Sequence, residues 1–573
     1  MNERAILIPL VLGTALIATT PPVQPPALRG YAQRSQAVPM ARPSDPAHAP
    51  LGASIGAPLS GNDDLFRTSD RCIACHKGVT TSAGLDVSIA YDWRASMMAN
   101  SARDPYWQAA VRRELIDHPE EAAAIEDNCS RCHMPMANVS ARAKGRAGTV
   151  FANLPGGDAT ESESAFAADG VACAVCHQVQ PDGLGEESSF TGGFTISDQS
   201  PEEGRSIFGP FEPDEGGAGI MHSATGFRPT EGLHVQSSEL CASCHTLFTH
   251  AIRLGGGEGP EFPEQGPYLE WQASSFAIEQ VSCQDCHMPE VQEDVPVTRV
   301  LGRARPDVSR HVFQGGNFFM LRMLNRYREE LGVVALPQEM ALAADRTEAH
   351  LRGSTASVEI QSASLEGSQL LIDVSVQNRA GHKFPTAYPS RRAWLHLTVD
   401  DRDGRRVFDS GAFSPDGSIV GNDHDEDGSR YEPHYEEISE ATQVQVYEAV
   451  MVDQRGAVTT GLMSAERWVK DNRLLPAGFD ASRADGRVSV HGAATSDASF
   501  TAGGDEVRYR VDVSPGAGPF TVTVELWFQP IAYRWAQNLS EYDSFETDRF
   551  VRYYESMAAA SALIVARTRA VVR

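Results

Sequence analysis

The pattern of apolar and polar residues changes character about halfway along the chain. Beyond residue 350, apolar residues alternate with polar ones, which is the period of half-buried β-strands. Segments of this kind lie at residues 357–360, 370–376, 394–399, 444–450, 507–513 and 520–528. Because Gly, Asp and Pro turns bound them, we predict an antiparallel β-sandwich over residues 352–530.

Two further segments frame this prediction. Residues 547–566 repeat apolar positions at helical spacing and are followed by basic residues, which favours a closing C-terminal helix. Residues 59–330 show no long period of either kind, which suggests short helices joined by long loops. The predicted fold class is therefore α+β, with an N-terminal, mostly helical, loop-rich domain followed by a β-sandwich and a helix.

The amino end has the composition of an export signal. Arg4 precedes an apolar run from residue 5 to 18, so residues 1–20 are predicted to be a signal peptide or a retained N-terminal membrane anchor. Residues 21–58 are rich in Pro and Ala and are predicted to be a linker. These features predict a periplasmic or extracellular location.

All ten cysteines fall into five Cys-x-x-Cys-His motifs within residues 59–330. The motifs are Cys72/Cys75/His76, Cys129/Cys132/His133, Cys173/Cys176/His177, Cys241/Cys244/His245 and Cys283/Cys286/His287. Zinc sites, disulfides and thioredoxin-like pairs also use closely spaced cysteines, but none of them requires His after every second Cys. The motifs therefore predict five covalent haem c groups, with the motif histidines as proximal iron ligands.

An internal repeat lies within this domain. Trp93-Arg94-Ala95-Ser96 stands between the first and second motifs, and Trp271-Gln272-Ala273-Ser274 stands between the fourth and fifth. Both the second and the fifth motifs continue as His-Met-Pro. We expect two related two-haem units that flank the third haem.

The sixth iron ligands decide whether a haem is closed or open to substrate. His222 and His234 lie in predicted loops among the haem motifs, where no strand or helix core explains them, so we expect both to be distal ligands. The alternative is a surface histidine.

These motifs resemble the cytochrome c-552/4 (c554-like) multihaem family, in which Trp-x-x-Ser elements and Cys-x-x-Cys-His-Met-Pro motifs recur. Residues 381–386 (Gly-His-Lys-Phe-Pro-Thr) and 470–476 are similar to segments of members with a trailing β-domain. The resemblance implies that His311 and His382 are distal ligands, and that His382 connects the β-domain to the haem domain. The family pattern has His where this chain has Met98, so Met98 is either a ligand or a packing residue; in the second case the iron uses His118 or has no sixth ligand.

One more site is suggested by residues 423–428, Asp-His-Asp-Glu-Asp-Gly. Asp423, Asp425 and Asp427 alternate as in a calcium loop, although His434 stands where the terminal Glu belongs. A solvated acidic turn is the alternative.

Charge limits the choice of partners. The chain has 573 residues, 76 acidic and 49 basic, and a formal charge of −27, so nucleic acid is not an expected partner. We predict electron transfer between redox proteins or extracellular electron acceptors. A reductase of nitrogen or sulfur oxyanions, or an oligomer that stacks into an extracellular cytochrome filament, is the alternative.

Overall fold

The computed structural model describes residues 65–196, 204–253 and 255–573, which all belong to one compact unit. The predicted signal peptide or anchor and the linker lie outside the described residues. Among the described residues, no helix is both long and apolar enough to span a membrane.

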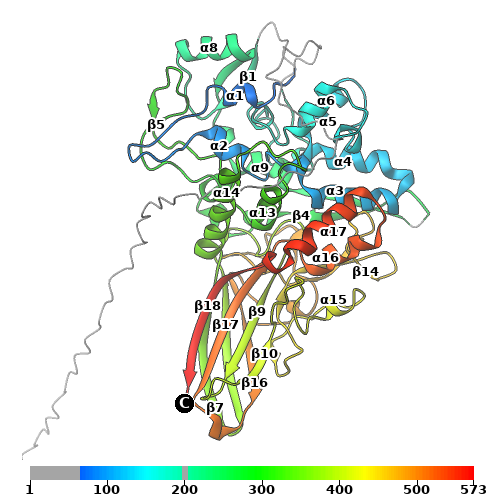
Figure 1. The fold of residues 1–573 in the computed structure, drawn as a ribbon, viewed down its shortest axis with the longest axis vertical. Coiled ribbons are helices and arrows are strands. Elements are labelled where there is room, and N and C mark those ends of the chain that lie inside the picture. The colour runs from blue at the N-terminus through cyan, green and yellow to red at the C-terminus, as the bar shows by residue number, and fades with distance from the viewer. Residues whose placement is uncertain (1–64, 197–203, 254) are drawn as a thin grey trace, which may run out of the picture. The chain divides into compact units, whose positions relative to one another are not determined.

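The haem-motif region consists of short helices and two-stranded hairpins or pairs. Its elements are α1 (Asp70–Ile73), α2 (Ile89–Arg94), α3 (Pro105–Asp117), α4 (Ala122–His133), α5 (Pro135–Ala143), α6 (Glu161–Ala168), α7 (Cys173–Cys176), β1 (Arg205–Gly209), α8 (Glu215–Thr225), β2 (Phe227–Glu231), α9 (Ser238–His245), β3 (Leu247–Ile252), β4 (Glu258–Gln265), α10 (Pro267–Gln272), α11 (Ser275–Ile278), α12 (Cys283–His287), β5 (Val295–Pro296) and β6 (Ala304–Arg305). Two helices, α13 (Phe318–Arg326) and α14 (Pro337–His350), pack together after it (Figure 1).

The β region begins at β7. Its elements are β7 (Ala356–Glu366), β8 (Gln369–Asn378), β9 (Arg392–Asp400), β10 (Arg406–Ser410), α15 (Asp423–Glu426), β11 (Glu437–Ile438), β12 (Val446–Tyr447), β13 (Ala449–Val452), β14 (Val458–Thr459), β15 (Arg467–Asp471), β16 (Gly504–Asp512), β17 (Phe520–Gln529), α16 (Tyr533–Asn538), α17 (Phe545–Met557) and β18 (Leu563–Val572).

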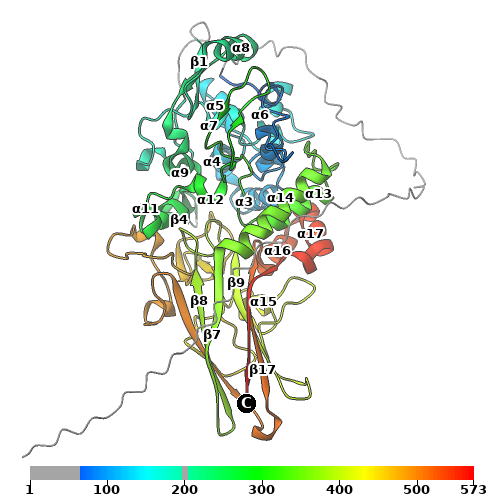
Figure 2. The same cartoon turned by 90° about the vertical axis from the view of Figure 1, so that its left-hand side faces the viewer.

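Two main sheets pack face to face in the β region. One has the order β11-β16-β8-β7, and the other has the order β10-β9-β17-β18 with β12 also on β9 (Figures 1 and 2). The strand pairs are antiparallel except for the short β11–β16 pair, which is parallel. Inward residues such as Ile372, Leu395 and Val524 are completely buried, because alternate positions on each strand point into the shared core. The α+β fold class predicted from the sequence is thus confirmed.

The prediction of a closing helix over residues 547–566 is wrong in its second half. Helix α17 ends at Met557, and residues 563–572 form strand β18, which pairs with β17 from Phe520↔Val572 to Phe528↔Leu563. The run of alanines at 558–560 extends a helical pattern locally. Pairing with β17 satisfies the backbone of the following segment, so tertiary contacts override that local preference.

A buried carboxylate joins the two regions. Glu270 at α10 is fully buried; one of its carboxylate oxygens accepts hydrogen bonds from the Lys383 backbone N–H (3.0 Å) and the Thr386 hydroxyl, and the other pairs with the Arg473 guanidinium (3.2 Å). The loop between β8 and β9, residues 379–391, is thereby attached to the haem-motif region.

Candidate cofactor site

The cysteines of the five motifs sit on or beside short helices. All ten thiols are free, and four motifs, all but the fifth, line one continuous cavity. Short helices suit this role because one helical turn presents Cys, Cys and His on neighbouring positions of one face. The residues present fit covalently bound haem, because thiols and imidazoles converge on an apolar-walled space.

Four of the five motif histidines are oriented by the backbone. A hydrogen bond joins Nδ1 to a carbonyl oxygen in each case: His76 to Val297 (2.9 Å), His133 to Ser101 (3.2 Å), His177 to Phe208 (2.5 Å) and His287 to Gln314 (2.5 Å). Since Nδ1 must carry the proton to donate to a carbonyl, Nε2 keeps its lone pair and is available to a metal. Burial lowers the pKa of His133 and of His287 to about 4, which keeps the rings neutral.

Two histidines from outside the motifs lie parallel to motif histidines. The ring of His311 is 6.1 Å from that of His177 with an angle of 17° between the planes, and the ring of His382 is 6.2 Å from that of His287 at 13°. Two imidazoles that each place a nitrogen about 2 Å from one metal ion have ring centres roughly 6 Å apart. Both pairs have the spacing of a bis-histidine iron site.

A third histidine near the fifth motif was missed by the sequence reasoning. His350, at the end of α14, lies 5.8 Å from the ring of His287 but is tilted by 54°. Its Nδ1 is 3.3 Å from the Gln314 side chain, and the backbone carbonyl of Gln314 bonds His287. His350 therefore contacts Gln314, whose backbone carbonyl orients His287.

The two histidines expected in loops are placed differently. His222 is exposed on α8, whereas its neighbour Met221 lines the cavity. The Nε2 atom of His234 is 2.9 Å from the carbonyl oxygen of Val179, and its ring packs edge-on against Phe208. The structure therefore does not bring either imidazole opposite a motif histidine. His118, the proposed substitute for Met98, bonds the hydroxyl of Ser464.

The internal repeat is present, but it pairs the motifs differently from the prediction. Trp93 Nε1 donates to the carbonyl of Val171, two residues before Cys173, and Trp271 Nε1 donates to that of Val281, two residues before Cys283. The backbone N–H of Val171 bonds the carbonyl of Met98, just as that of Val281 bonds the carbonyl of Phe276.

Hydrogen bonds to serine hydroxyl groups join the same pairs of motifs. Ser69 bonds the backbone N–H of Cys173, and Ser238 bonds that of Cys283. Each serine stands three residues before the first Cys of a motif. One unit therefore consists of the first and third motifs, with the second motif inserted between them, and the other unit consists of the fourth and fifth motifs. The sequence alone does not indicate this grouping, because the Ser69–Cys173 contact joins residues 104 positions apart.

Thiols of different motifs lie next to one another. Cys72 lies close enough to Cys173, Cys132 to Cys244, and Cys241 to Cys283 for each neighbour to raise the pKa of the first thiol. The thiol of Cys176 lies close enough to Cys241 and Cys244 for their charges to interact. These contacts connect all five motifs into one cluster.

The three carboxylates of the suggested calcium loop do not converge. Asp425 forms a buried ion pair with Arg392 (2.8 Å), Asp423 pairs with Arg430, and Asp427 bonds the backbone N–H and hydroxyl of Ser429. Their oxygens are satisfied by protein groups that turn them apart. The structure thus gives no support to calcium binding at this loop.

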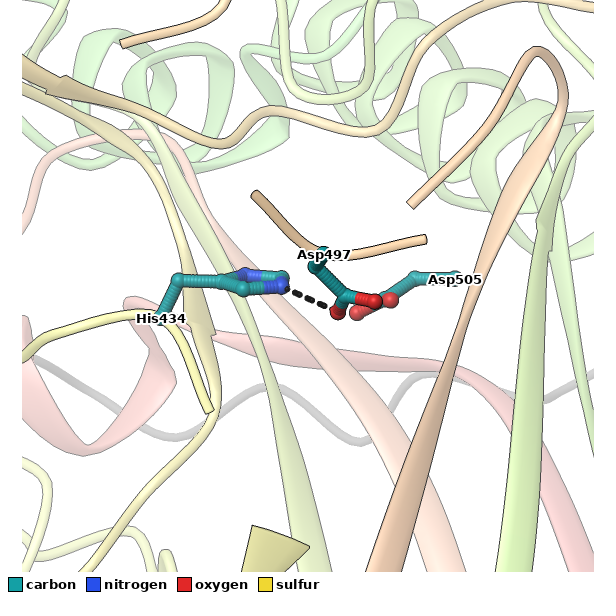
Figure 3. A group of neighbouring side chains, drawn as sticks. All are labelled: His434, Asp497 and Asp505. Carbon is teal, nitrogen blue, oxygen red and sulfur yellow. Dashed lines mark hydrogen bonds and ion pairs between the residues drawn. The ribbon is translucent and has the colours of Figure 1, made fainter. Parts of the chain in front are cut away.

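His434, which stands near that loop, belongs to another cluster (Figure 3). His434, Asp497 and Asp505 are the one group of potential metal ligands that converges within the described residues. The Nδ1 atom of His434 receives the side-chain amide N–H groups of Gln445 (2.9 Å) and Asn472 (3.0 Å).

Those two amides are held in this orientation, because their oxygens accept the backbone N–H groups of Tyr435 and Glu448. Nδ1 is thus an acceptor, and Nε2 must carry the proton that it donates to Asp497 (2.9 Å). A protonated nitrogen cannot bind a metal ion, so this cluster is a hydrogen-bond network within the β region.

Comparison with known proteins does not assign the chain to a family. No protein family model matches the chain, and no curated protein matches it. A crystal structure of a penta-heme cytochrome c552 from Thermochromatium tepidum is similar at 14% sequence identity and a TM-score of 0.48, covering 89% of this chain and 99% of that one. The functional argument therefore rests on the residues of this chain.

Proposed function

We propose that this protein is a c-type cytochrome with five covalent haems that transfers electrons between redox partners outside the cytoplasm. The observation that carries the proposal is the cluster of adjacent thiols that connects all five motifs. Thioether sulfurs stand at haem edges, so adjacent cysteines imply closely spaced haems. When bound, haem iron supplies reversible one-electron chemistry.

The axial ligands proposed for two irons are histidine pairs. His177 with His311 and His287 with His382 have the ring spacing of such a pair, and the planes of each pair are near parallel. Bis-histidine iron has no open position, which suits electron transfer rather than substrate chemistry. His382 lies in the loop that Glu270 holds, so the β region supplies a ligand to the haem-motif region.

For Met98, the repeat favours the packing alternative. Met98 holds the position that Phe276 holds in the second unit. Phe276 and Trp271 lie against Gly381, directly before the proposed ligand His382. We propose that Met98 similarly packs beside the haem cavity, which its side chain lines. Met98→Leu would then leave every haem potential unchanged, whereas a drop in one potential would restore Met98 as a ligand.

The location and partners remain those expected from the sequence. Haem attachment to Cys-x-x-Cys-His and the predicted signal support an exported protein. The charge of −27 favours encounter with positively charged redox proteins or oxidised metal species. Assembly into a filament is tested by electron microscopy of the purified protein.

The ligand assignment can be tested with single histidine variants. His311→Ala and His382→Ala should each convert one low-spin iron to high spin in the electron paramagnetic resonance spectrum. Intact mass after unfolding should still show five haems, because the thioether bonds are untouched. His250→Ala, an exposed histidine on β3, is the matched control. Spectra identical to wild type in both variants would refute the assignment.

A further inference from the structure

Three segments from elsewhere in the chain each bind one haem motif twice. A backbone carbonyl of the segment accepts a hydrogen bond from Nδ1 of the motif histidine, which is His76, His133 or His287. A side chain of the same segment donates a second hydrogen bond to a backbone carbonyl of that motif. These side-chain donors, which we name the clip residues, are Thr298, Ser101 and Gln314.

At the first motif, two neighbouring residues make the two bonds. The hydroxyl of Thr298 donates to the carbonyl of Cys75 (2.9 Å), and Val297 supplies the carbonyl that accepts from His76 (2.9 Å). Because the segment is bound at two successive residues, its carbonyl has little freedom to move away from the imidazole.

At the second and fifth motifs, one residue makes both bonds. The hydroxyl of Ser101 donates to the carbonyl of His133 (2.8 Å), and the carbonyl of Ser101 accepts from that ring (3.2 Å). The side-chain amide of Gln314 donates to the carbonyl of Cys286 (2.9 Å), and its backbone carbonyl accepts from the ring of His287 (2.5 Å). His133 and Cys286 lie in the last turns of α4 and α12, where helix carbonyls lack an intrahelical partner. The clip residues supply the missing donors.

The contact at the fifth motif extends to His350. Because Nε2 of Gln314 donates to the Cys286 carbonyl, the same nitrogen also donates to Nδ1 of His350 (3.3 Å). Nδ1 of His350 is then an acceptor, so the proton of the neutral ring is on Nε2. A protonated nitrogen cannot bind iron. His350 therefore holds the amide of Gln314, and His382 remains the proposed ligand.

The third motif has the same two bonds, but both come from the backbone of Phe208. Its N–H donates to the carbonyl of His177 (2.6 Å), and its carbonyl accepts from the ring (2.5 Å). At the other three motifs, by contrast, a single side chain can be removed while the ligand, the cysteines and the accepting carbonyl all stay in the chain.

We propose that Thr298, Ser101 and Gln314 are positioning residues that set the reduction potentials of the first, second and fifth haems. A hydrogen bond from Nδ1 to a carbonyl makes Nε2 more basic, and a more basic ligand stabilises Fe(III) relative to Fe(II). Each clip residue keeps that carbonyl in place and thereby keeps the potential low. The inference rests on the proposed haem attachment, and it explains how haems with the same motif can differ in potential.

The test is a redox titration of the purified holoprotein, followed at the haem absorption bands. Thr298→Val, Ser101→Ala and Gln314→Leu should each raise one of the five potentials, and the three variants should affect three different haems. We expect the ratio of Fe(II) to Fe(III) at a fixed ambient potential to change by about threefold to tenfold, where tenfold corresponds to about 59 mV for a one-electron couple. His350→Leu should give a smaller rise in the same haem as Gln314→Leu.

Two matched variants serve as controls. Thr495→Val removes a hydroxyl that donates to the Gly492 carbonyl (2.8 Å) in the β region. Gln292→Leu removes an exposed amide that donates to the Glu290 carbonyl (3.2 Å). Both should leave all five potentials unchanged, because neither bond involves a haem motif.

The outcomes separate this inference from a role in folding alone. Clip variants that carry five haems by mass and have wild-type potentials, even with lowered stability, would overturn the inference and leave the proposed function intact. A shift of all five potentials together would also overturn it, because that indicates general loosening. Thr298 and Gln314 are only partly buried, so their variants decide the question if Ser101→Ala does not fold. A haem deficit in the wild-type protein would instead refute the proposed function.

Discussion

The haem-motif region and the β region fill their interiors in different ways. In the β region, alternate residues of long strands, such as Ile372, Val374 and Leu395, meet in a core with no exposed surface. In the haem-motif region, short helices surround a cavity lined by thiols, imidazoles and a few aromatic side chains. The comparison teaches that the β region specifies its interior with its own side chains, whereas the haem-motif region depends on the cofactor.

Producing the chain without haem attachment should have the largest effect, and it should affect the haem-motif region far more than the β region. We expect residues 70–290 to lose most of their protection from hydrogen exchange, because four of the five motifs line a cavity that bound haem would fill. Peptides from 369–378, 392–400 and 504–529 should stay protected, since their strands pair and pack among themselves. Exchange measured by mass spectrometry checks this, and equal protection of both regions would show that the haem-motif region has a sufficient core.

Removing the Glu270 contacts that connect the two regions should have the next largest effect. Glu270→Ala leaves the buried Arg473 charge without one of its partners, and loss of one member of a buried ion pair costs about 3–5 kcal/mol. The spectrum of the haem at His287 should also change, because Glu270 holds the loop that carries His382. Glu261→Gln, an exposed carboxylate on β4, is the control. Chemical denaturation followed at the haem absorption band measures both effects.

A core variant should affect one region alone. Leu395 on β9 is fully buried, so Leu395→Ala should lower the free energy of unfolding of the β region by about 2–5 kcal/mol. The haem spectrum before unfolding should be unchanged. Val571→Ala, at an exposed position of β18, should have little effect on stability. A changed native haem spectrum in Leu395→Ala would show that the two interiors are coupled.

The last prediction concerns pH. Burial raises the pKa of Asp505 to about 7 from an ordinary value near 3.8. Between these values the folded protein keeps a proton that the unfolded chain releases, so this group makes stability fall as pH rises, by about 1.4 kcal/mol per unit at most. Asp505→Asn should remove that slope. Thermal denaturation from pH 4 to pH 7 measures it, and an identical slope in the variant would assign the proton elsewhere.

The sequence predicted the strands and the haem motifs well for a physical reason. Strand alternation and Cys-x-x-Cys-His spacing are both local patterns that one segment carries by itself. Strand β18 was mistaken for the end of a helix because its conformation is decided by its partner β17. The first motif belongs with the third because Ser69 bonds the backbone N–H of Cys173, and no local sequence pattern predicts this contact.

The same distinction applies to the candidate sites. A resemblance led us to expect His311 and His382 as distal ligands, but it did not say that His311 lies opposite His177 and His382 opposite His287, and the periodicity of the chain gave no sign of it.

The close approach of cysteines from different motifs also constrains how the protein matures. In the folded chain, Cys72 lies close to Cys173, Cys132 lies close to Cys244, and Cys241 lies close to Cys283. In an oxidising compartment, neighbouring thiols are substrates for disulfide formation. Thiol oxidation and cofactor attachment therefore compete for the same sulfur atoms, and a cross-motif disulfide would block two attachment sites at once. If the chain approaches this fold in such a compartment before haem is attached, its thiols must be kept reduced until each motif has been filled.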